Sequence, residues 1–148
     1  MPVVTLPVAP DGPIVPIILH LSRPRVQLLK TAQHAVPPSM TGRGLIDTGA
    51  SKTAIDSSVV QTLGLVATGV SNMLTPSTGP IPYVCNQYDI SLGIVLLPKV
   101  HVASWEIPVV EARLLNQGQG IHALLGRDVL AGGMIAYNGK TNTFSIAF

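Results

Sequence analysis

The residue types best suited to acid–base chemistry lie in one short run, Leu45–Ser51, which reads LIDTGAS. An apolar stretch leads into Asp47, and Thr48 and Gly49 follow it as a polar turn. The glycine admits turn conformations and close backbone approaches that a Cβ would obstruct. Hydrolysis of a peptide without a metal or a nucleophilic side chain needs one group that takes a proton from water and another that donates one. Asp47 is the candidate for such a group.

One carboxylate is not enough for this chemistry. Two carboxylates about 3 Å apart cannot both ionise, so they share a proton and act together as acid and base. The other aspartates lack a following Thr-Gly or Ser-Gly; they are Asp11, Asp56, Asp89 and Asp128. The second carboxylate must therefore come from a second chain. A twofold axis through the site would place Asp47 beside its own symmetry mate, so the sequence predicts a homodimer.

A second motif follows downstream at Ala123–Asp128, which reads ALLGRD. The two motifs, in this order and with a candidate hairpin between them, resemble the retropepsin family of aspartic proteases over roughly residues 44–148. The resemblance implies an aspartic endopeptidase in which Asp47 of each chain activates water and protonates the carbonyl. It implies no cofactor and no metal, and its partners are a second copy of the chain and a peptide or protein substrate.

The same resemblance assigns supporting roles around Asp47. It implies that Thr48 hydrogen-bonds to the other subunit, with Gly49 and Ala50 supporting the active site. Gly126, Arg127 and Asp128 would support the structure and the dimer, the arginine through ion pairing and Asp128 as the cap of a short helix. The expected flap, which would bind substrate, has its tip at Pro76, Ser77, Thr78, Gly79 and Pro80. Retroviral enzymes have a glycine-rich tip, so this tip departs from the family pattern.

The elements that position these motifs are mostly strands. Residues 14–21 read as a strand in which Pro16 favours an edge position, because proline cannot donate to a sheet. Residues 23–39 are ambiguous between strand and other structure. Asp56 is typical of a helix N-cap, and Gly64 of the glycine that ends a helix. A strand–turn–strand pattern over residues 73–90 predicts a hairpin.

The remaining patterns complete a single all-β domain. Further strands are expected at residues 94–97, 100–103, 107–110 and 123–125, and Asp128 as the cap of one helical turn. Asn138-Gly139 predicts a two-residue turn in a terminal hairpin, because both residues accept positive φ. The expected fold, over residues 1–148, is a retropepsin-like closed β-barrel with one or two short helices.

Composition limits the other function classes. The net charge is only +2 and basic residues do not cluster, which argues against a nucleic-acid partner. Residues 57–88 carry no Lys, Arg, Asp or Glu, but their prolines rule out a membrane-spanning helix. The single cysteine, Cys85, allows no intrachain disulfide, so a cytoplasmic location is expected, and Cys85 is predicted to be a small buried residue. Low charge over residues 57–88 predicts an apolar groove that cleaves between hydrophobic side chains. Single histidines without paired spacing, His20, His101 and His122, do not indicate a metal site.

Two other interpretations remain open from the sequence. One is a catalytically weak or inactive module that uses the fold for peptide binding or dimerisation, because fold does not determine function. Alternatively, the chain is a structural subunit of a larger assembly. The complete motif around Asp47 favours the protease over both.

Overall fold

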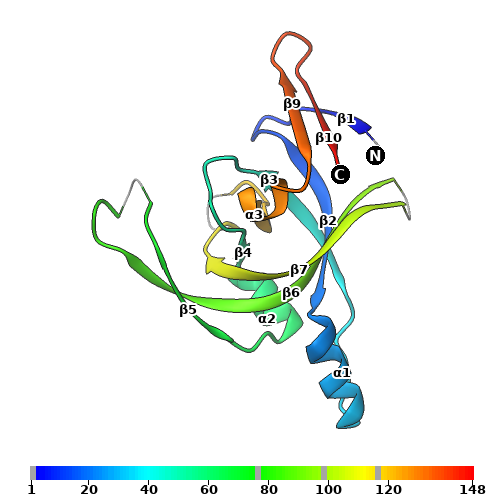
Figure 1. Cartoon of the computed structure of the whole chain (residues 1–148), viewed down its shortest axis with the longest axis vertical. Coiled ribbons are helices and arrows are strands. Elements are labelled where there is room, and N and C mark those ends of the chain that lie inside the picture. The colour runs from blue at the N-terminus through cyan, green and yellow to red at the C-terminus, as the bar shows by residue number, and fades with distance from the viewer. Residues whose placement is uncertain (1–2, 76–77, 98–99, 116–117) are drawn as a thin grey trace.

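A closed ring of six β-strands forms the body of the chain in the computed structural model, which describes residues 3–75, 78–97, 100–115 and 118–148 (Figure 1). The ring order is β2 (Ile14–Leu21), β3 (Met40–Ile46), β8 (Ala123–Leu125), β4 (Ala54–Asp56), β7 (Val100–Ala112) and β6 (Tyr83–Leu97). Strand β6 also pairs with β2, which closes the barrel. The predicted all-β closed barrel is confirmed.

A separate three-stranded sheet joins the two ends of the chain. Its order is β1 (Val3–Pro7), β10 (Thr143–Ala147) and β9 (Met134–Asn138). Phe144 and Ile146 of β10 are fully buried in the same hydrophobic core as the barrel strands. The terminal sheet therefore packs on the barrel, with β1 and β10 side by side (Figure 1).

Strand β2 shows why these residues form a barrel. Val15, Ile17, Leu19 and Leu21 are buried, while the residues between them are less so. This alternation is the pattern of a strand with one face on the core, because successive side chains point to opposite faces. The prediction that Pro16 marks an edge strand is wrong, since β2 pairs with both β3 and β6. Pro16 is tolerated because the β6 pairing covers only Ile17–Leu21.

Two long strands replace three of the shorter predicted ones. The predicted strands at residues 94–97, 100–103 and 107–110 are parts of β6 and β7. These two strands pair antiparallel, with Gln87 opposite Val110 at one end and Leu97 opposite Val100 at the other. The pairing shifts register near Val95, as in a β-bulge. Strand β5 (Gly69–Met73) pairs antiparallel with β6, with Gly69 opposite Gln87 and Met73 opposite Tyr83. The predicted hairpin is therefore confirmed.

Helix α2 (Ser57–Leu63) has the ends that the sequence predicts. The Asp56 carboxylate accepts from the Ser58 N–H at 2.8 Å, and Gly64 is left-handed with φ 58°. Asp56 is buried and also accepts from the Leu114 and Leu115 N–H groups at 2.7 and 2.9 Å. Burial alone would raise the pKa of Asp56, but hydrogen bonds from Ser58, Leu115 and Leu114 outweigh it and lower the pKa.

The ambiguous segment after β2 forms helix α1 (Arg23–Thr31), which adds a helix to the predicted short ones. Its sequence signals are weak: Ser22 makes no side-chain cap bond and the first turn has no acidic residue. Val26 and Leu29 pack partly against the core. Tertiary contact therefore favours the helix where local propensity is neutral. Across the described ranges, no helix is long and apolar enough to cross a membrane.

The terminal hairpin is present, but its turn differs from the prediction. Asn138 pairs with Thr143, so four residues lie between the strands rather than a tight Asn-Gly pair. The Asn138 side chain accepts from the Lys140 and Thr141 N–H groups at 3.1 and 3.3 Å. Asn142, with φ 53°, takes the left-handed conformation. An asparagine side chain that closes the loop locally competes with the two-residue turn.

Candidate active site

The turn around Asp47 begins where β3 ends at Ile46. The Asp47 N–H donates to the Leu125 carbonyl at 3.0 Å, and its carbonyl accepts from the Ala50 N–H at 3.2 Å. The carboxylate oxygen Oδ1 accepts from the Gly49 N–H at 2.9 Å. These bonds hold both backbone and carboxylate, and Oδ2 has no hydrogen-bond partner among the described residues. One carboxylate oxygen is fixed, and the other is available.

Gly49 lies close to the Asp47 carboxylate in this geometry. A Cβ at this position would lie 3.2 Å from Asp47 Oδ1, closer than most Cβ contacts. A larger residue would therefore push the carboxylate away from the N–H that orients it. The glycine expected at this turn is explained by close approach rather than by a positive φ.

The second motif lies directly behind the turn. The Arg127 N–H donates to the Ala50 carbonyl at 2.9 Å, and its guanidinium Nη1 donates to the Thr48 carbonyl at 3.1 Å. A Cβ on Gly126 would lie 2.6 Å from the Lys52 carbonyl carbon, so only glycine fits there. The structure thus brings together the two motifs, which are about eighty residues apart in the chain.

Asp128 lies in the first turn of helix α3 (Arg127–Leu130) rather than at the N-cap position, which Gly126 occupies without a side-chain cap bond. Its Oδ1 accepts from the Val129 N–H at 2.9 Å, so Asp128 does bond to the start of the helix, although not from the N-cap position. Asp128 also accepts from Thr53: the N–H donates to Oδ2 at 2.9 Å and the hydroxyl to Oδ1 at 2.7 Å. The same hydroxyl accepts from the Gly126 N–H at 3.0 Å. Asp128 therefore links the segment after the Asp47 turn to the second motif.

Thr53 is one site residue that the sequence analysis missed, as are Lys52 and Ser71, which line the pocket beside Asp47. Thr53 is fully buried, and its hydroxyl joins Asp128 to Gly126. The available signal was a hydroxyl next to the apolar pair Ala54-Ile55, since a buried hydroxyl needs a partner. Thr48, in contrast, is exposed, and its hydroxyl has no partner within the described part of the chain. Its predicted bond to another subunit stays a prediction.

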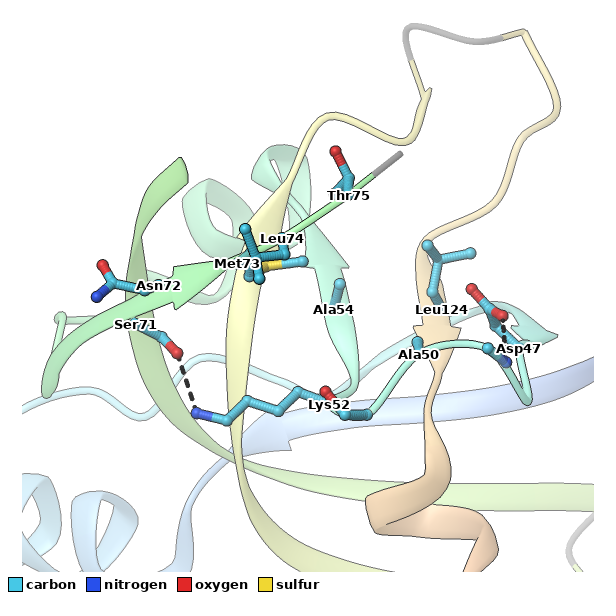
Figure 2. A pocket seen from close by; sticks show the side chains of 12 residues that line it. Asp47, Ala50, Lys52, Ala54, Ser71, Asn72, Met73, Leu74, Thr75 and Leu124 are labelled. Atoms are coloured by element: carbon cyan, nitrogen blue, oxygen red, sulfur yellow. Dashed lines mark hydrogen bonds between the residues drawn. The ribbon is translucent and has the colours of Figure 1, made fainter. Parts of the chain in front are cut away.

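Asp47 opens onto a pocket of about 590 Å³ (Figure 2). Its walls come from the Asp47 turn, from β5 and the residues after it, and from β4 and β8. The lining residues are Asp47, Gly49, Ala50, Ser51, Lys52, Ala54, Ser71, Asn72, Met73, Leu74, Thr75 and Leu124. Two members of this set are charged, Asp47 and Lys52, so the pocket is less apolar than the sequence predicts.

The predicted flap tip lies beyond this lining. Thr78, Gly79 and Pro80 do not line the pocket, and Pro76 and Ser77 lie outside the described residues. The tip is closed by reciprocal bonds: the Thr75 N–H donates to the Thr78 hydroxyl at 2.9 Å, which donates to the Thr75 carbonyl, also at 2.9 Å. Gly79 adopts a left-handed conformation with φ 60°. Two threonines three residues apart were the sequence signal for these hydrogen bonds.

Cys85 lies on β6 under the pocket, where it packs with Ala54 and Val110. Its thiol donates to the Ser71 carbonyl at 3.4 Å. Burial raises the pKa of the Cys85 thiol, and the nearby positive charge of Lys52 opposes that shift only in part. The thiol is therefore neutral and unreactive at neutral pH. Its prediction as a small buried residue is confirmed.

The histidines make backbone contacts. His20 Nε2 lies 3.1 Å from the Pro37 carbonyl, and His122 Nδ1 accepts from the Arg43 N–H at 3.2 Å. The side chain of His101 lies outside the described part. In the described portion of the chain, no group of three or more His, Cys, Asp or Glu residues lies close enough to hold a metal ion.

A closed β-barrel with a carboxylate in an Asp-Thr-Gly turn beside a pocket is the arrangement of an acid protease subunit. The family described as Aspartyl protease matches residues 39–129, which include both motifs. The chain belongs to this family. No match was found among curated proteins.

Two solved structures are similar to this chain. A retropepsin-like aspartic protease from Rickettsia conorii superimposes with a TM-score of 0.54 at 14% identity, covering 98% of this chain and 90% of that one. The retroviral protease-like domain of Ddi1 from Leishmania major is 10% identical, with a TM-score of 0.41 and coverages of 92% and 94%. The first of these confirms the retropepsin-like fold.

Proposed function

We propose that the chain is an aspartic endopeptidase that acts as a homodimer, with Asp47 of each chain forming the catalytic pair. The observation that carries this proposal is the Asp47 turn, in which one carboxylate oxygen accepts the Gly49 N–H while the group opens onto the pocket. Such a carboxylate is oriented before substrate binds. Preorganised groups of this kind contribute to catalysis because they need little rearrangement during the reaction.

The chemistry requires the second chain. With one carboxylate ionised and the other protonated, the pair removes a proton from water while it donates one to the scissile carbonyl. The chain carries a single Asp-Thr-Gly motif, so a monomer lacks half of this pair. The exposed Thr48 hydroxyl, without a partner in the described residues, is consistent with a bond to the second subunit.

The β5–β6 hairpin is proposed as the flap. Ser71, Asn72 and Met73 of β5 line the pocket, together with Leu74 and Thr75, so this hairpin forms one wall of the candidate site. A peptide held in extended form would pair with backbone groups and place alternate side chains in pockets. Closure of such a hairpin over the substrate would exclude water from the reacting bond.

The test compares wild type with Asp47→Asn on a broad peptide library. Asparagine keeps the shape of the side chain but cannot exchange the proton, so hydrolysis should be lost while fold and dimer persist. Asp11→Asn, which removes an exposed carboxylate that does not line the pocket, is the matched control and should cleave like wild type. An Asp47 variant with activity within about tenfold of wild type would contradict the proposal. A folded, dimeric wild type that binds peptides without cleaving any would favour the inactive binding module.

A further inference from the structure

Lys52 provides a positive charge in the pocket at some distance from the catalytic turn. Its side chain points away from Asp47 and toward β5, where Nζ donates to the Ser71 hydroxyl at 3.0 Å (Figure 2). An ammonium group has three donors, and this bond uses one of them. Two donors therefore remain for a ligand in the pocket.

The backbone that carries Lys52 is held rigidly. Gly126 packs against its carbonyl group, and the adjacent Thr53 N–H is bonded to Asp128. The ammonium itself is anchored by Ser71. A charged group presented from fixed backbone loses less freedom when it binds a partner than one on a mobile loop.

No carboxylate of the described residues lies within ion-pair distance of Lys52. The one ion pair among them joins Arg23 and Glu106, on the other side of β6 from the pocket residues of β5. Glu111 accepts a hydrogen bond from the Tyr88 hydroxyl at 2.9 Å, and the Cys85 thiol beside Ser71 is neutral. Lys52 is thus a cation without a partner carboxylate, facing a cavity that is open to a peptide.

We propose that Lys52 is a specificity-determining residue that binds an acidic side chain, aspartate or glutamate, of the substrate peptide. This inference rests on the proposed protease function and names its substrate class. The apolar residues Met73, Leu74 and Leu124 in the same pocket would contact hydrophobic side chains of the peptide. The substrate is then a peptide with hydrophobic residues and one acidic residue, rather than the wholly apolar segment that the sequence predicts.

The geometry also limits where the acidic residue lies in the peptide. An extended strand rises about 3.3 Å per residue and points successive side chains to opposite faces. Because Lys52 points away from Asp47, the acidic residue should not be one of the two that flank the cleaved bond. It should occupy a single more distant position on one side of that bond.

The test uses a peptide library with a fixed cleavable core, in which each outer position is varied in turn among Glu, Gln and Lys. Wild type should prefer Glu over Gln at one outer position by about two- to fivefold in kcat/KM, in the range expected for an exposed ion pair. Lys52→Glu should invert this preference in favour of Lys at the same position. Lys52→Gln, a milder change, should abolish the preference for Glu over Gln. It is the variant to use if Lys52→Glu does not fold.

Lys140→Glu is the matched control, because Lys140 is exposed in the β9–β10 loop and does not line the pocket. It makes the same charge change and should keep the wild-type preference. If wild type cleaves the library but shows no Glu preference at any position, or if Lys52→Gln retains the preference, the inference is wrong and the protease function stands.

A binding measurement separates this inference from the proposed function. The same peptides, labelled with a fluorophore, are titrated with Asp47→Asn and with Asp47→Asn/Lys52→Gln. Tighter binding of the Glu peptide that depends on Lys52 would support the inference even if no peptide is cleaved. Equal binding of Glu and Gln peptides by both variants would overturn it.

Discussion

The two walls of the pocket are stabilised in different ways. The wall that carries Asp47 is bonded to distant parts of the chain, because Leu125, Arg127 and Asp128 all hydrogen-bond to the segment from Asp47 to Thr53. In the opposite wall, the hairpin tip is closed by bonds between Thr75 and Thr78, three residues apart. The first arrangement depends on the whole fold, whereas the second is local. In the proposed mechanism this difference matters, because the carboxylate must stay fixed while a flap must move.

The largest effect should come from Gly126→Ala, which disrupts the packing of the wall that carries Asp47. The new Cβ would lie 2.6 Å from the Lys52 carbonyl carbon and 2.7 Å from its oxygen, both backbone atoms that cannot rotate away. We expect a loss of about 3 kcal/mol in the free energy of unfolding, together with loss of activity. Urea denaturation measures the first and peptide cleavage the second.

Gly132→Ala is the control for this substitution, because a Cβ there meets nothing within 4 Å. Its free energy of unfolding should stay within about 0.5 kcal/mol of wild type. Equal stability of the two alanine variants would show that Gly126 is not packed against the turn.

A second variant, Thr53→Val, removes the hydroxyl between Asp128 and Gly126 and preserves the shape of the side chain. The Gly126 N–H would lose its acceptor in a buried position, which should cost about 2 kcal/mol. Thr53→Ser keeps the hydroxyl and should recover most of that loss in thermal or urea denaturation. If serine is no more stable than valine, the hydrogen bonds do not stabilise this wall.

A smaller effect should appear at acidic pH through Asp56. Hydrogen bonds lower the pKa of Asp56 below its ordinary value of 3.8, despite the opposing effect of burial. The stabilisation it provides is therefore complete at neutral pH and is lost as the pH falls below 3.8 through the folded-state pKa. The unfolding midpoint of wild type should fall more steeply with acidification than that of Asp56→Asn. Parallel pH profiles for the two proteins would contradict this assignment.

The smallest effect on stability should come from the second wall. Thr78→Val removes the hydrogen bonds between the Thr78 hydroxyl and the Thr75 backbone at the hairpin tip. Because these bonds are local, the free energy of unfolding should change by less than about 1 kcal/mol. KM should rise, since a looser hairpin holds the peptide less well. Thr78→Ser is the matched control. A large loss of stability with unchanged KM would show that the tip supports the fold and does not contact substrate.

What the sequence predicted well is explained by local signals. Asp56 and Gly64 define helix α2 because each acts within a few residues of itself, and the Asp47 turn is a contiguous motif. The Thr53–Asp128 link joins residues far apart in the chain, and no local pattern predicts such a contact. Asp128 was predicted to cap a helix because capping is the common local role of aspartate, and its bond to the Val129 N–H is local. Its bonds to Thr53 arise only from the tertiary structure.

The same distinction explains the errors in the fold. Helix α1 lacks a side-chain cap and forms where Val26 and Leu29 contact the core, which the sequence alone does not show. The turn after β9 was predicted from Asn138-Gly139, but the Asn138 side chain and the left-handed Asn142 favour a longer loop. In both cases a weak local preference was outweighed by packing or by a competing hydrogen bond.

The measurement that tests the central claim most directly is a titration of wild type with Asp47→Asn at constant total chain concentration. The two chains are refolded together so that subunits mix freely, and peptide cleavage is measured against the wild-type fraction. If each active site needs Asp47 from both chains, activity follows the square of that fraction, and an equal mixture retains about one quarter of wild-type activity. A linear fall, with about half of the activity left at equal mixture, would show that one chain suffices and would contradict the shared site.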